Sequence, residues 1–375
     1  MQQTNTLIIG ASIAGLSCAA CLHKQNLEYI IIEQHDKVAT PWRNHYHRLH
    51  LHTNKRLSNL PYKKFGSQIP RYPTRQQVVD YLDEYSNAFN INPVFNCQAI
   101  SVTRDGDYWI TTTNKGIFRS ANLVFATGIY GKPNTINIKG METFPGRILH
   151  SSDYKTGKDF ANKNVLVIGF GNSACEIAID LYEQGAMPAM SVRSSVNIIP
   201  RDILGIPVLE LSLLMNNLPP RVADKLNAPL INLLVGNISR LGLHPKTIGP
   251  LEQISVEETT PVLDIGTVKH IRKGHIKIYN DIDHINGNLV HFKDGRQQAF
   301  DTIVAGIGYT HRIDGIINLD KSRLDDIQRN TKQQQYFGKD GLYFCGFHIS
   351  ATGQIREISL DAKRIAAHIA NRKKV

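Results

Sequence analysis

Two stretches of the chain share one pattern, TLIIGASIAGLSCAACL at residues 6–22 and VLVIGFGNSACEIAIDL at residues 165–181. Each begins with a short run of β-branched residues, turns at glycines, and continues with apolar residues at the three-to-four spacing of a helix. A second strand-like run follows each helix, EYIIIE at residues 28–33 and MSVRSS at residues 190–195. The sequence therefore predicts the same strand–turn–helix–strand unit twice.

The turn of each unit is suited to hold a phosphate group. Glycines let the backbone bend tightly and approach a pyrophosphate, whose charge is met by free N–H groups at the start of the helix. The second unit reads G-x-G-x-x-A from Gly169 to Ala174. The first runs from Gly10 to Gly15 with Ser12 in place of the middle glycine, a small residue that can donate a hydrogen bond. Together the two units predict two dinucleotide sites of the Rossmann kind.

The residue at the end of each second strand indicates which nucleotide the unit binds. Glu33 lies 23 residues after Gly10, where a carboxylate accepts hydrogen bonds from ribose hydroxyls and repels a 2′-phosphate, as suits FAD or NAD. Arg193 lies 24 residues after Gly169 and is followed by Ser194, a pair that suits the 2′-phosphate of NADPH. The alternative interpretation makes both charged residues ordinary solvated strand ends.

The order of the segments predicts that one domain is inserted into the other. We expect an α/β fold with an FAD-binding domain at residues 1–155 and 297–375, interrupted by an NADPH-binding domain at residues 156–296. The predicted elements include a helix from Thr74, which has the character of an N-cap, and a C-terminal helix. An apolar helical stretch at residues 207–243 is expected to form a buried cap over the active site, and the alternative is a membrane-surface face.

Composition excludes several classes of function. Lys and Arg number 43 against 32 Asp and Glu, a net charge of +11, but no block of five basic residues occurs, so we expect no nucleic-acid partner. No apolar run approaches the roughly 18 residues that span a bilayer, and we expect a cytoplasmic protein with no integral membrane segment. Five cysteines at irregular spacing give no disulfide framework, and Cys18-Ala-Ala-Cys21 lies in an apolar helix, which favours packing over redox chemistry.

The motif between the two units resembles that of the flavin-containing monooxygenases. Their signature F-x-G-x-x-x-H-x-x-x-(Y/F/K/W) is similar to the stretch from Phe144 through Gly146 and His150 to Tyr154. Further stretches resemble the YUCCA-type branch, which makes indole-3-acetate from indole-3-pyruvate. They include RYPTRQQVVDYL, HSSDYKTGKDF, VRSSVNIIPRDILG and GNISRLGLHPKTIGPLE.

The resemblance, with the turns above, implies the site residues. Around FAD we expect Gly10, Ser12, Ala14, Gly15, Glu33, Trp42, Arg48, Leu49, Ala126, Thr127, Gly128, Gly346 and Gln354. Around NADPH we expect Gly169, Gly171, Asn172, Ser173, Ala174, Arg193 and Ser194. The candidates for catalysis beside the flavin ring are His52, Lys55 and Asn59. The alternative for His45, His47, His50 and His52 is a metal site, which the lack of a cysteine or carboxylate partner disfavours, so we predict no metal.

The resemblance also implies the reaction. A member of this branch uses FAD, NADPH and O₂ through a C4a-peroxyflavin to decarboxylate an aromatic α-keto acid such as indole-3-pyruvate. The partners are then a small-molecule substrate and O₂, and a homodimer is an open alternative to a monomer. Two rival functions remain: a monooxygenase that oxygenates nitrogen or sulfur or inserts oxygen beside a ketone, and a flavin-binding protein without oxygenase activity.

Overall fold

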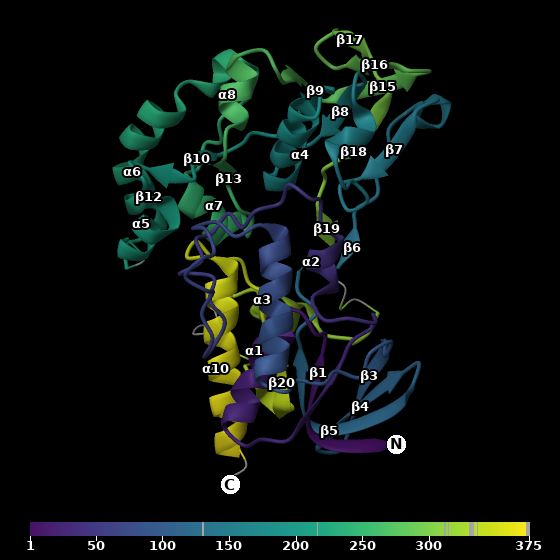
Figure 1. The fold of residues 1–375 in the computed structure, drawn as a ribbon, viewed down its shortest axis with the longest axis vertical. Helices are drawn as coiled ribbons and strands as arrows, with labels where there is room; N and C mark the ends of the chain where they lie inside the picture. The colour runs from purple at the N-terminus through teal and green to yellow at the C-terminus, as the bar shows by residue number, and fades with distance from the viewer. Residues whose placement is uncertain are drawn as a thin grey trace. The chain divides into compact units, whose positions relative to one another are not determined.

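The chain folds into two compact units in a computed structural model that describes residues 1–129, 131–215, 217–310, 313, 315–329, 334–335 and 337–372 (Figure 1). Unit 1 comprises Met1–Asn44, Thr53–Lys132 and Tyr309–Val375. Unit 2 comprises His45–His52 and Pro133–Gly308. The short strands β6 (Lys132–Pro133) and β19 (Tyr309–Thr310) lie where the chain passes from one unit to the other.

The unit boundaries differ from the expected domain boundaries at residues 155/156 and 296/297. The reason is a strand pairing: β7 (Arg147–His150) joins the sheet of unit 2 through β18 (Thr302–Ala305), its parallel neighbour. Residues 133–155 and 297–308, which flank the predicted insertion, therefore belong to unit 2. The boundaries fall at residues 132/133 and 308/309.

Unit 1 is built on a six-stranded sheet. Neighbouring strands lie in the order β2-β1-β5-β4-β3, and β20 pairs with β5. The strands are β1 (Gln2–Ile9), β2 (Tyr29–Ile32), β3 (Ala99–Asp105), β4 (Tyr108–Thr113), β5 (Gly116–Phe125) and β20 (Leu342–Phe344). β5 is long enough to pair in antiparallel fashion with β4 along its first half and in parallel with β20 along its last three residues. The strands β2, β1, β5 and β20 form the parallel part of the sheet.

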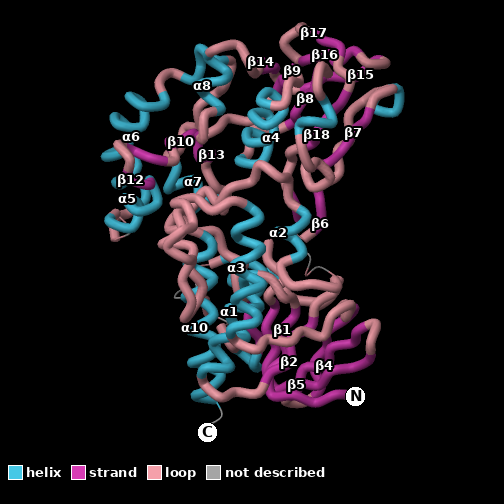
Figure 2. The backbone as a smooth tube through the Cα atoms, viewed as in Figure 1, coloured by secondary structure: helices cyan, strands magenta, loops and turns pink. Residues whose placement is uncertain are grey.

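Three helices of unit 1 pack together, with α1 in contact with both others (Figures 1 and 2). They are α1 (Ile13–Lys24), α3 (Arg75–Ala88) and α10 (Gln354–Arg372). The predicted N-cap is confirmed, because Thr74 accepts a hydrogen bond from the backbone N–H of Gln77 and the Gln77 side chain closes a capping box. The shorter elements of the unit are α2 (Thr40–Asn44), α9 (Lys321–Gln328) and the 3₁₀ turn η4 (Lys339–Gly341).

The cysteines of the chain are packing residues. All five are free and buried. Burial raises the pKa of Cys21 to about 12, so its thiol stays protonated at neutral pH. Cys18 and Cys21 lie on α1, which is buried from Ile13 to Leu22 because its small residues allow close approach on every side.

Unit 2 is built on a five-stranded, all-parallel sheet in the order β14-β9-β8-β18-β7. The strands not yet given are β8 (Asn164–Ile168), β9 (Met187–Ser191) and β14 (Lys277–Tyr279). The helices α4 (Asn172–Glu183) and α8 (Thr267–Arg272) pack on each other beside this sheet. A small antiparallel sheet, β15 (Ile282–Asn286), β16 (Leu289–Phe292) and β17 (Gln297–Ala299), and the 3₁₀ turns η1 (Met141–Thr143) and η2 (Gly157–Phe160) complete it.

A helical excursion leaves the sheet of unit 2 after β9 and returns at α8. It contains β10 (Ile198–Pro200), β11 (Asp202–Ile203), β12 (Ile206–Pro207), α5 (Val208–Leu214), α6 (Pro220–Val235), η3 (Ile238–Leu241), α7 (Pro250–Glu257) and β13 (Val262–Asp264). The helices α5 and α6 lie within the stretch of residues 207–243 that the sequence predicts to be helical, and α6 begins after its N-cap Pro219. Their burial was predicted as well, but the structure leaves many of their large apolar side chains exposed.

Candidate functional site

The first glycine-rich turn connects β1 to α1 in unit 1. A Cβ added at Gly15 would lie 1.8 Å from the Gly10 carbonyl oxygen, so only glycine lets the helix approach the turn this closely. Gly10 itself has φ +103°, in the region that favours glycine. Ser12 is the N-cap of α1 with φ −110°, a conformation open to any residue, and its side chain caps no N–H group. The turn therefore tolerates the serine and leaves the helix N-terminus available to an anion.

Glu33 follows β2 and is buried beside this turn. Its Oε2 accepts a hydrogen bond of 2.8 Å from the Ala11 N–H, and its Oε1 accepts one of 3.0 Å from the His35 N–H. The carboxylate thus holds the turn in place through the Ala11 N–H. Since a carboxylate has about four acceptor positions, two remain for hydroxyl groups of a ligand.

Two further segments of unit 1 carry predicted FAD contacts. Ala126, Thr127 and Gly128 directly follow β5, and the Thr127 hydroxyl is buried with no hydrogen-bond partner among the described residues. Gly346 follows β20, and its carbonyl accepts a hydrogen bond of 3.1 Å from the Gln354 side chain at the start of α10. Orphaned buried hydroxyls are rare, so Thr127 fits a site that a polar ligand completes.

The second glycine-rich turn connects β8 to α4 in unit 2. A Cβ added at Gly171 would meet nothing within 4 Å, which leaves open space at the N-terminus of α4. Ala174 takes the place of the third glycine, and a Cβ added to Gly306 would lie only 2.8 Å from its methyl group, so helix and strand pack closely. Ser173 is half-buried in the first turn of α4. Asn172 is engaged elsewhere, because its Oδ1 accepts from the Leu263 N–H at 2.8 Å.

The predicted 2′-phosphate contacts follow β9 in the same unit. Arg193 and Ser194 are exposed, and neither side chain makes a hydrogen bond or ion pair with any residue that the structure describes. A free guanidinium after a parallel strand is suited to a phosphate.

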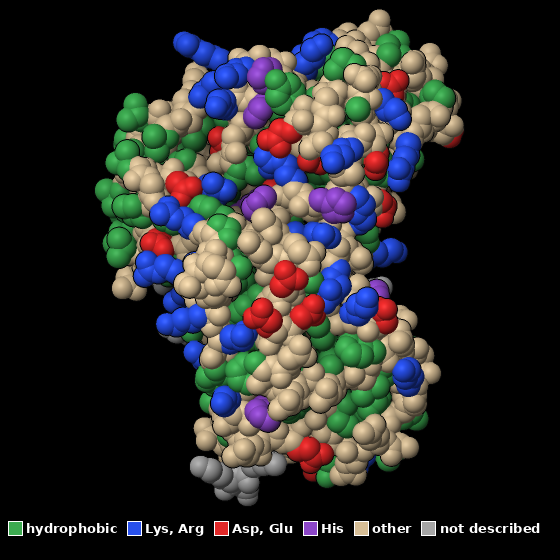
Figure 3. All heavy atoms as spheres, in the orientation of Figure 1, with side chains coloured by type: hydrophobic (Ala, Val, Ile, Leu, Met, Phe, Trp, Pro, Cys, Tyr) green, Lys and Arg blue, Asp and Glu red, His purple; other side chains and the backbone are tan. Residues whose placement is uncertain are grey.

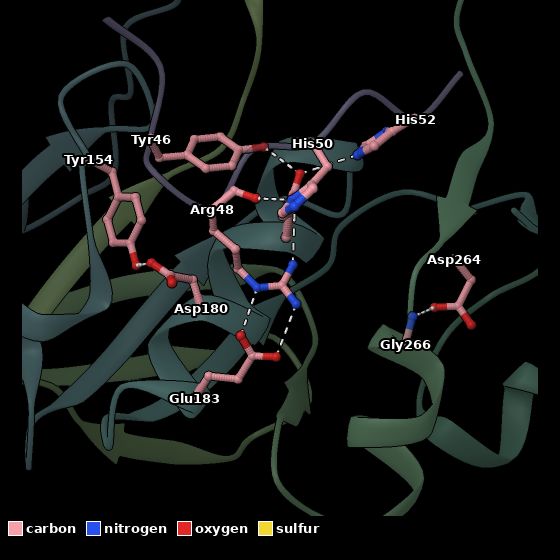
Figure 4. A network of polar contacts seen from close by, with 10 residues as sticks. Tyr46, Arg48, His50, His52, Tyr154, Asp180, Glu183, Asp264 and Gly266 are labelled. Carbon is pink, nitrogen blue, oxygen red and sulfur yellow. Dashed lines mark hydrogen bonds and ion pairs between the residues drawn. The ribbon is translucent and has the colours of Figure 1, made fainter. Parts of the chain in front are cut away.

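A network of polar contacts covers one face of α4 (Figure 4). Its centre is Glu176, a fully buried carboxylate that sequence analysis missed. Its Oε2 accepts from the Tyr46 hydroxyl at 2.9 Å and lies 3.2 Å from Nε2 of His52. Its Oε1 lies 3.4 Å from the guanidinium of Arg48, which also forms a bidentate pair with Glu183 at 2.8 and 3.0 Å.

The network joins the segment of residues 45–52 to the helix that begins at the second turn. One helical turn beyond Glu176, Asp180 accepts from the Tyr154 hydroxyl at 2.6 Å and from the Gly157 N–H at 2.8 Å. The hydrogen bond from Arg48 lowers the pKa of Glu183. Burial, reinforced by the charge of Glu176, raises the pKa of Tyr46 well above its usual value. The tyrosine therefore stays a hydrogen-bond donor at neutral pH.

The residues of the monooxygenase-like signature have structural roles in unit 2. A Cβ added at Gly146 would lie 2.2 Å from the Asp301 carbonyl oxygen, so this position requires glycine. The ring of His150 lies 3.1 Å from the Gly308 carbonyl oxygen through Nε2 and 3.0 Å from the Ser152 hydroxyl through Nδ1. Tyr154 is buried and binds Asp180.

The three candidates for catalysis are divided between the units. His52 belongs to unit 2 and faces Glu176, whereas Lys55 and Asn59 belong to unit 1. The Lys55 ammonium donates to the carbonyls of Gly66, Ser67 and Ile69, and the Asn59 side chain accepts from the Phe65 N–H at 2.8 Å. Lys55 and Asn59 thus both hold the loop at residues 59–69 in place, and their role in catalysis stays a prediction.

Three further residues that were predicted around FAD are at least partly buried. Trp42 is half-buried on α2, Leu49 packs against the apolar core of unit 2, and Ala14 is buried on α1. In the described ranges, no group of three or more His, Cys, Asp or Glu side chains is arranged to hold a metal ion.

His348 is a residue that sequence analysis missed: it is buried in unit 1, its Nδ1 lies 3.6 Å from Asp361, and its Nε2 has no partner among the described residues.

Comparisons with known proteins agree on the family. The profile of the pyridine nucleotide-disulphide oxidoreductases matches residues 7–201. The indole-3-pyruvate monooxygenase YUCCA6 of Arabidopsis thaliana is 36% identical over 98% of this chain and 90% of that protein. The indole-3-pyruvate monooxygenase YUCCA1 of Oryza sativa subsp. japonica is 33% identical over 91% of this chain and 86% of that protein.

Solved structures share the fold at low sequence identity. A flavin-containing monooxygenase from Stenotrophomonas maltophilia superposes with a TM-score of 0.72 at 18% identity, over all of both chains. A cyclohexanone monooxygenase from Rhodococcus sp. Phi1 bound to NADP⁺ superposes with a TM-score of 0.73 at 16% identity, over all of this chain and 85% of the other. With its two nucleotide turns, its signature from Phe144 to Tyr154 and these relatives, the chain belongs to the flavin monooxygenase family, in the branch of the YUCCA-type indole-3-pyruvate monooxygenases.

Proposed function

We propose that the protein is an FAD- and NADPH-dependent monooxygenase that oxidatively decarboxylates an aromatic α-keto acid such as indole-3-pyruvate. The keto acid, O₂, NADPH and one proton give the carboxylic acid shortened by one carbon, together with CO₂, NADP⁺ and water. The observation that carries the proposal is the identity of 33–37% with indole-3-pyruvate monooxygenases over nearly the whole chain.

The residues of unit 1 fit FAD. The turn from Gly10 to Gly15 presents an uncapped helix N-terminus to a pyrophosphate, and Glu33 keeps acceptor positions for ribose hydroxyls. The unpartnered Thr127 hydroxyl would gain a hydrogen-bond partner from the cofactor. When bound, the flavin would supply the redox chemistry: it accepts two electrons from NADPH and then activates O₂.

The residues of unit 2 fit NADPH. The open space at Gly171 would hold the pyrophosphate, and the free guanidinium of Arg193 would pair with the 2′-phosphate. Glu176 holds the His52 ring by Nε2, which fixes the orientation of the imidazole and leaves its Nδ1 without a partner among the described residues. His52 is therefore our first candidate for a catalytic residue.

We also propose a cytoplasmic setting. All five cysteines are free, as expected in a reducing compartment.

A substrate panel tests the proposed reaction. The purified protein should be yellow, release FAD and not FMN on denaturation, and oxidise NADPH faster in the presence of aromatic α-keto acids. Amines, sulfides and cyclic ketones serve as the comparison. Stimulation by one of these classes, and not by the keto acids, would assign the protein to a different monooxygenase reaction. Failure of NADPH to reduce the bound flavin would leave a flavin-binding protein without oxygenase activity.

A further inference from the structure

The helical excursion of unit 2 exposes an apolar surface. Of the sixteen large hydrophobic residues that are exposed in the described chain, nine lie between residues 204 and 234. They are Leu204, Ile206, Leu214, Leu218, Val222, Leu226, Leu230, Leu233 and Leu234. Leu204, Leu214 and Leu233 are between 79% and 91% exposed, which a monomeric soluble protein avoids unless the surface binds something.

The helix α6 is apolar on two opposite faces. One face is anchored: Ala223 and Val235 are buried, and the Asp224 carboxylate accepts the N–H groups of Leu251 and Glu252 at 3.0 and 2.9 Å, so that it caps α7. The other face carries Val222, Leu226, Leu230 and Leu233, which follow each other at spacings of three and four residues, all exposed. The anchored face fixes α6 to unit 2. The exposed apolar face therefore keeps its position although no described residue covers it.

The exposed charges on the segment that carries this face are basic. Among the described residues from 204 to 241, the exposed charged ones are Arg221, Lys225 and Arg240, while Asp224 is buried and Glu210 is half-buried. Arg221 is paired with Glu252 of α7. Lys225 and Arg240 make no hydrogen bond or ion pair with any described residue.

A basic cleft continues the surface at the C-terminal end of α6. The cleft is open to solvent, has a volume of about 370 Å³, and is lined by the charged residues Arg240, Arg272, Lys277 and Arg296. Of these, Arg296 is paired with Asp294. The guanidinium of Arg272 binds the carbonyl of Val235, the last residue of α6, so the cleft lies beside the C-terminal end of this helix. Figure 3 shows apolar side chains gathered over α5 and α6 and Lys and Arg side chains beside them near α8.

We propose that this surface binds peripherally to an anionic membrane, with the apolar face of α6 in the headgroup boundary and lipid phosphates at the basic cleft. An amphipathic helix whose apolar side carries Leu and whose border carries Lys and Arg binds at such an interface through buried apolar area and attraction to anionic lipids. With 16 residues α6 is too short to cross the bilayer and would lie along it. No helix among the described residues qualifies as a membrane span.

A second copy of the chain fits this surface less well. In a two-fold interface the same patch meets itself, so α6 would pack on α6 of the partner and bring Lys225 and Arg240 of both copies into one interface. Anionic headgroups neutralise the same residues. The charge pattern therefore favours lipid over self-association.

Vesicle sedimentation with the full-length protein tests the proposal. We expect binding to vesicles of phosphatidylcholine and phosphatidylglycerol, weaker binding to phosphatidylcholine alone, and further weakening by sodium chloride. The double variant Leu226→Gln with Leu233→Gln should bind anionic vesicles about tenfold or more weakly. Leu360→Gln, which changes an exposed leucine on α10 of unit 1, is the matched control and should bind like the wild type. Glutamine keeps helix propensity, and equal thermal midpoints would show that the variants fold.

The charge contribution is tested separately. Arg240→Glu with Lys277→Glu should remove the preference for anionic vesicles. Three results would overturn the proposal: no sedimentation with either vesicle, binding that the leucine variant leaves unchanged, or a dimer in light scattering that the leucine variant dissociates. The last result would assign the surface to a second copy. None of these measurements depends on the proposed enzymatic activity.

Discussion

Glu176 shows how a single buried residue organises a site. Its carboxylate has no exposed surface, yet three side chains from residues 46–52 direct polar groups at it. Burying a charge is costly unless it is paired and hydrogen-bonded, and here Arg48 supplies the charge while Tyr46 and His52 supply hydrogen bonds. The cost of burial is offset by fixing the segment that carries His52 against α4.

Replacing Glu176 by glutamine should therefore destabilise the protein strongly. The amide keeps one acceptor but turns an NH₂ group toward Tyr46, Arg48 or His52, and we expect a loss of about 3 kcal/mol or more in the free energy of unfolding. Guanidinium unfolding followed by circular dichroism measures it. Glu183→Gln is the matched control: Glu183 also pairs with Arg48, but its side chain is 43% exposed, and its loss should stay below about 1 kcal/mol. Equal losses in the two variants would contradict the central role of Glu176.

Arg193 is the residue on which the choice of NADPH over NADH should depend. A charge-assisted hydrogen bond to the 2′-phosphate is worth roughly 1.5–3 kcal/mol, or about a ten- to hundredfold difference in affinity. Arg193→Ala should weaken NADPH binding by this factor and leave NADH binding nearly unchanged, as measured by titration of protein fluorescence. Arg147→Ala, at the opposite end of the sheet at the start of β7, should change neither affinity. If Arg193→Ala weakens both nucleotides equally, another residue selects the cofactor.

At the scale of elements, the two glycine-rich turns use glycine for different reasons. At Gly15 the glycine is needed for packing, since a Cβ would lie 1.8 Å from a carbonyl oxygen of the same turn. At Gly171 the φ angle is −90° and the space for a Cβ is open, so packing within the protein does not require glycine there. We propose that this second glycine serves the approach of a ligand.

This difference predicts opposite outcomes for the same substitution. Gly15→Ala should lower the thermal midpoint and prevent retention of FAD, because α1 must move away from the turn. Gly171→Ala should keep the wild-type midpoint and its flavin, but should weaken NADPH binding, because the added methyl occupies the phosphate cradle. Thermal scans, flavin absorbance and NADPH titration measure these properties. Wild-type NADPH affinity in Gly171→Ala would show that the nucleotide binds elsewhere.

For the whole molecule, local sequence patterns were informative where neighbours in the chain determine the structure. The two strand–turn–helix units, the cap at Thr74 and the helices on either side of Pro219 all follow from residues a few positions apart. The role of Glu176 could not be derived in this way, because its partners lie 124 to 130 residues away in the sequence. A hint was present: acidic residues at 176, 180 and 183 lie three and four apart on the helix predicted after the second glycine-rich turn.

The exposure of apolar side chains on the helical excursion could not be predicted from the sequence either. Apolar residues at helical spacing predict a helix with a buried face, but α6 has apolar residues on both faces and only one is covered within its unit. Boundaries between the two units depend on the pairing of β7 with β18, strands separated by about 150 residues, which no local pattern encodes. Long-range pairing is the information that the single sequence lacked.

The proposed reaction is tested most directly by following labelled oxygen from O₂. The protein, NADPH and an aromatic α-keto acid are incubated under ¹⁸O₂ in the presence of catalase, which removes free hydrogen peroxide that decarboxylates α-keto acids without an enzyme. We predict one labelled oxygen atom in the new carboxylate, release of CO₂, and NADPH consumption that matches product formation. Continued NADPH oxidation without label in the acid would show an oxidase acting on these compounds and would contradict the proposed monooxygenase reaction.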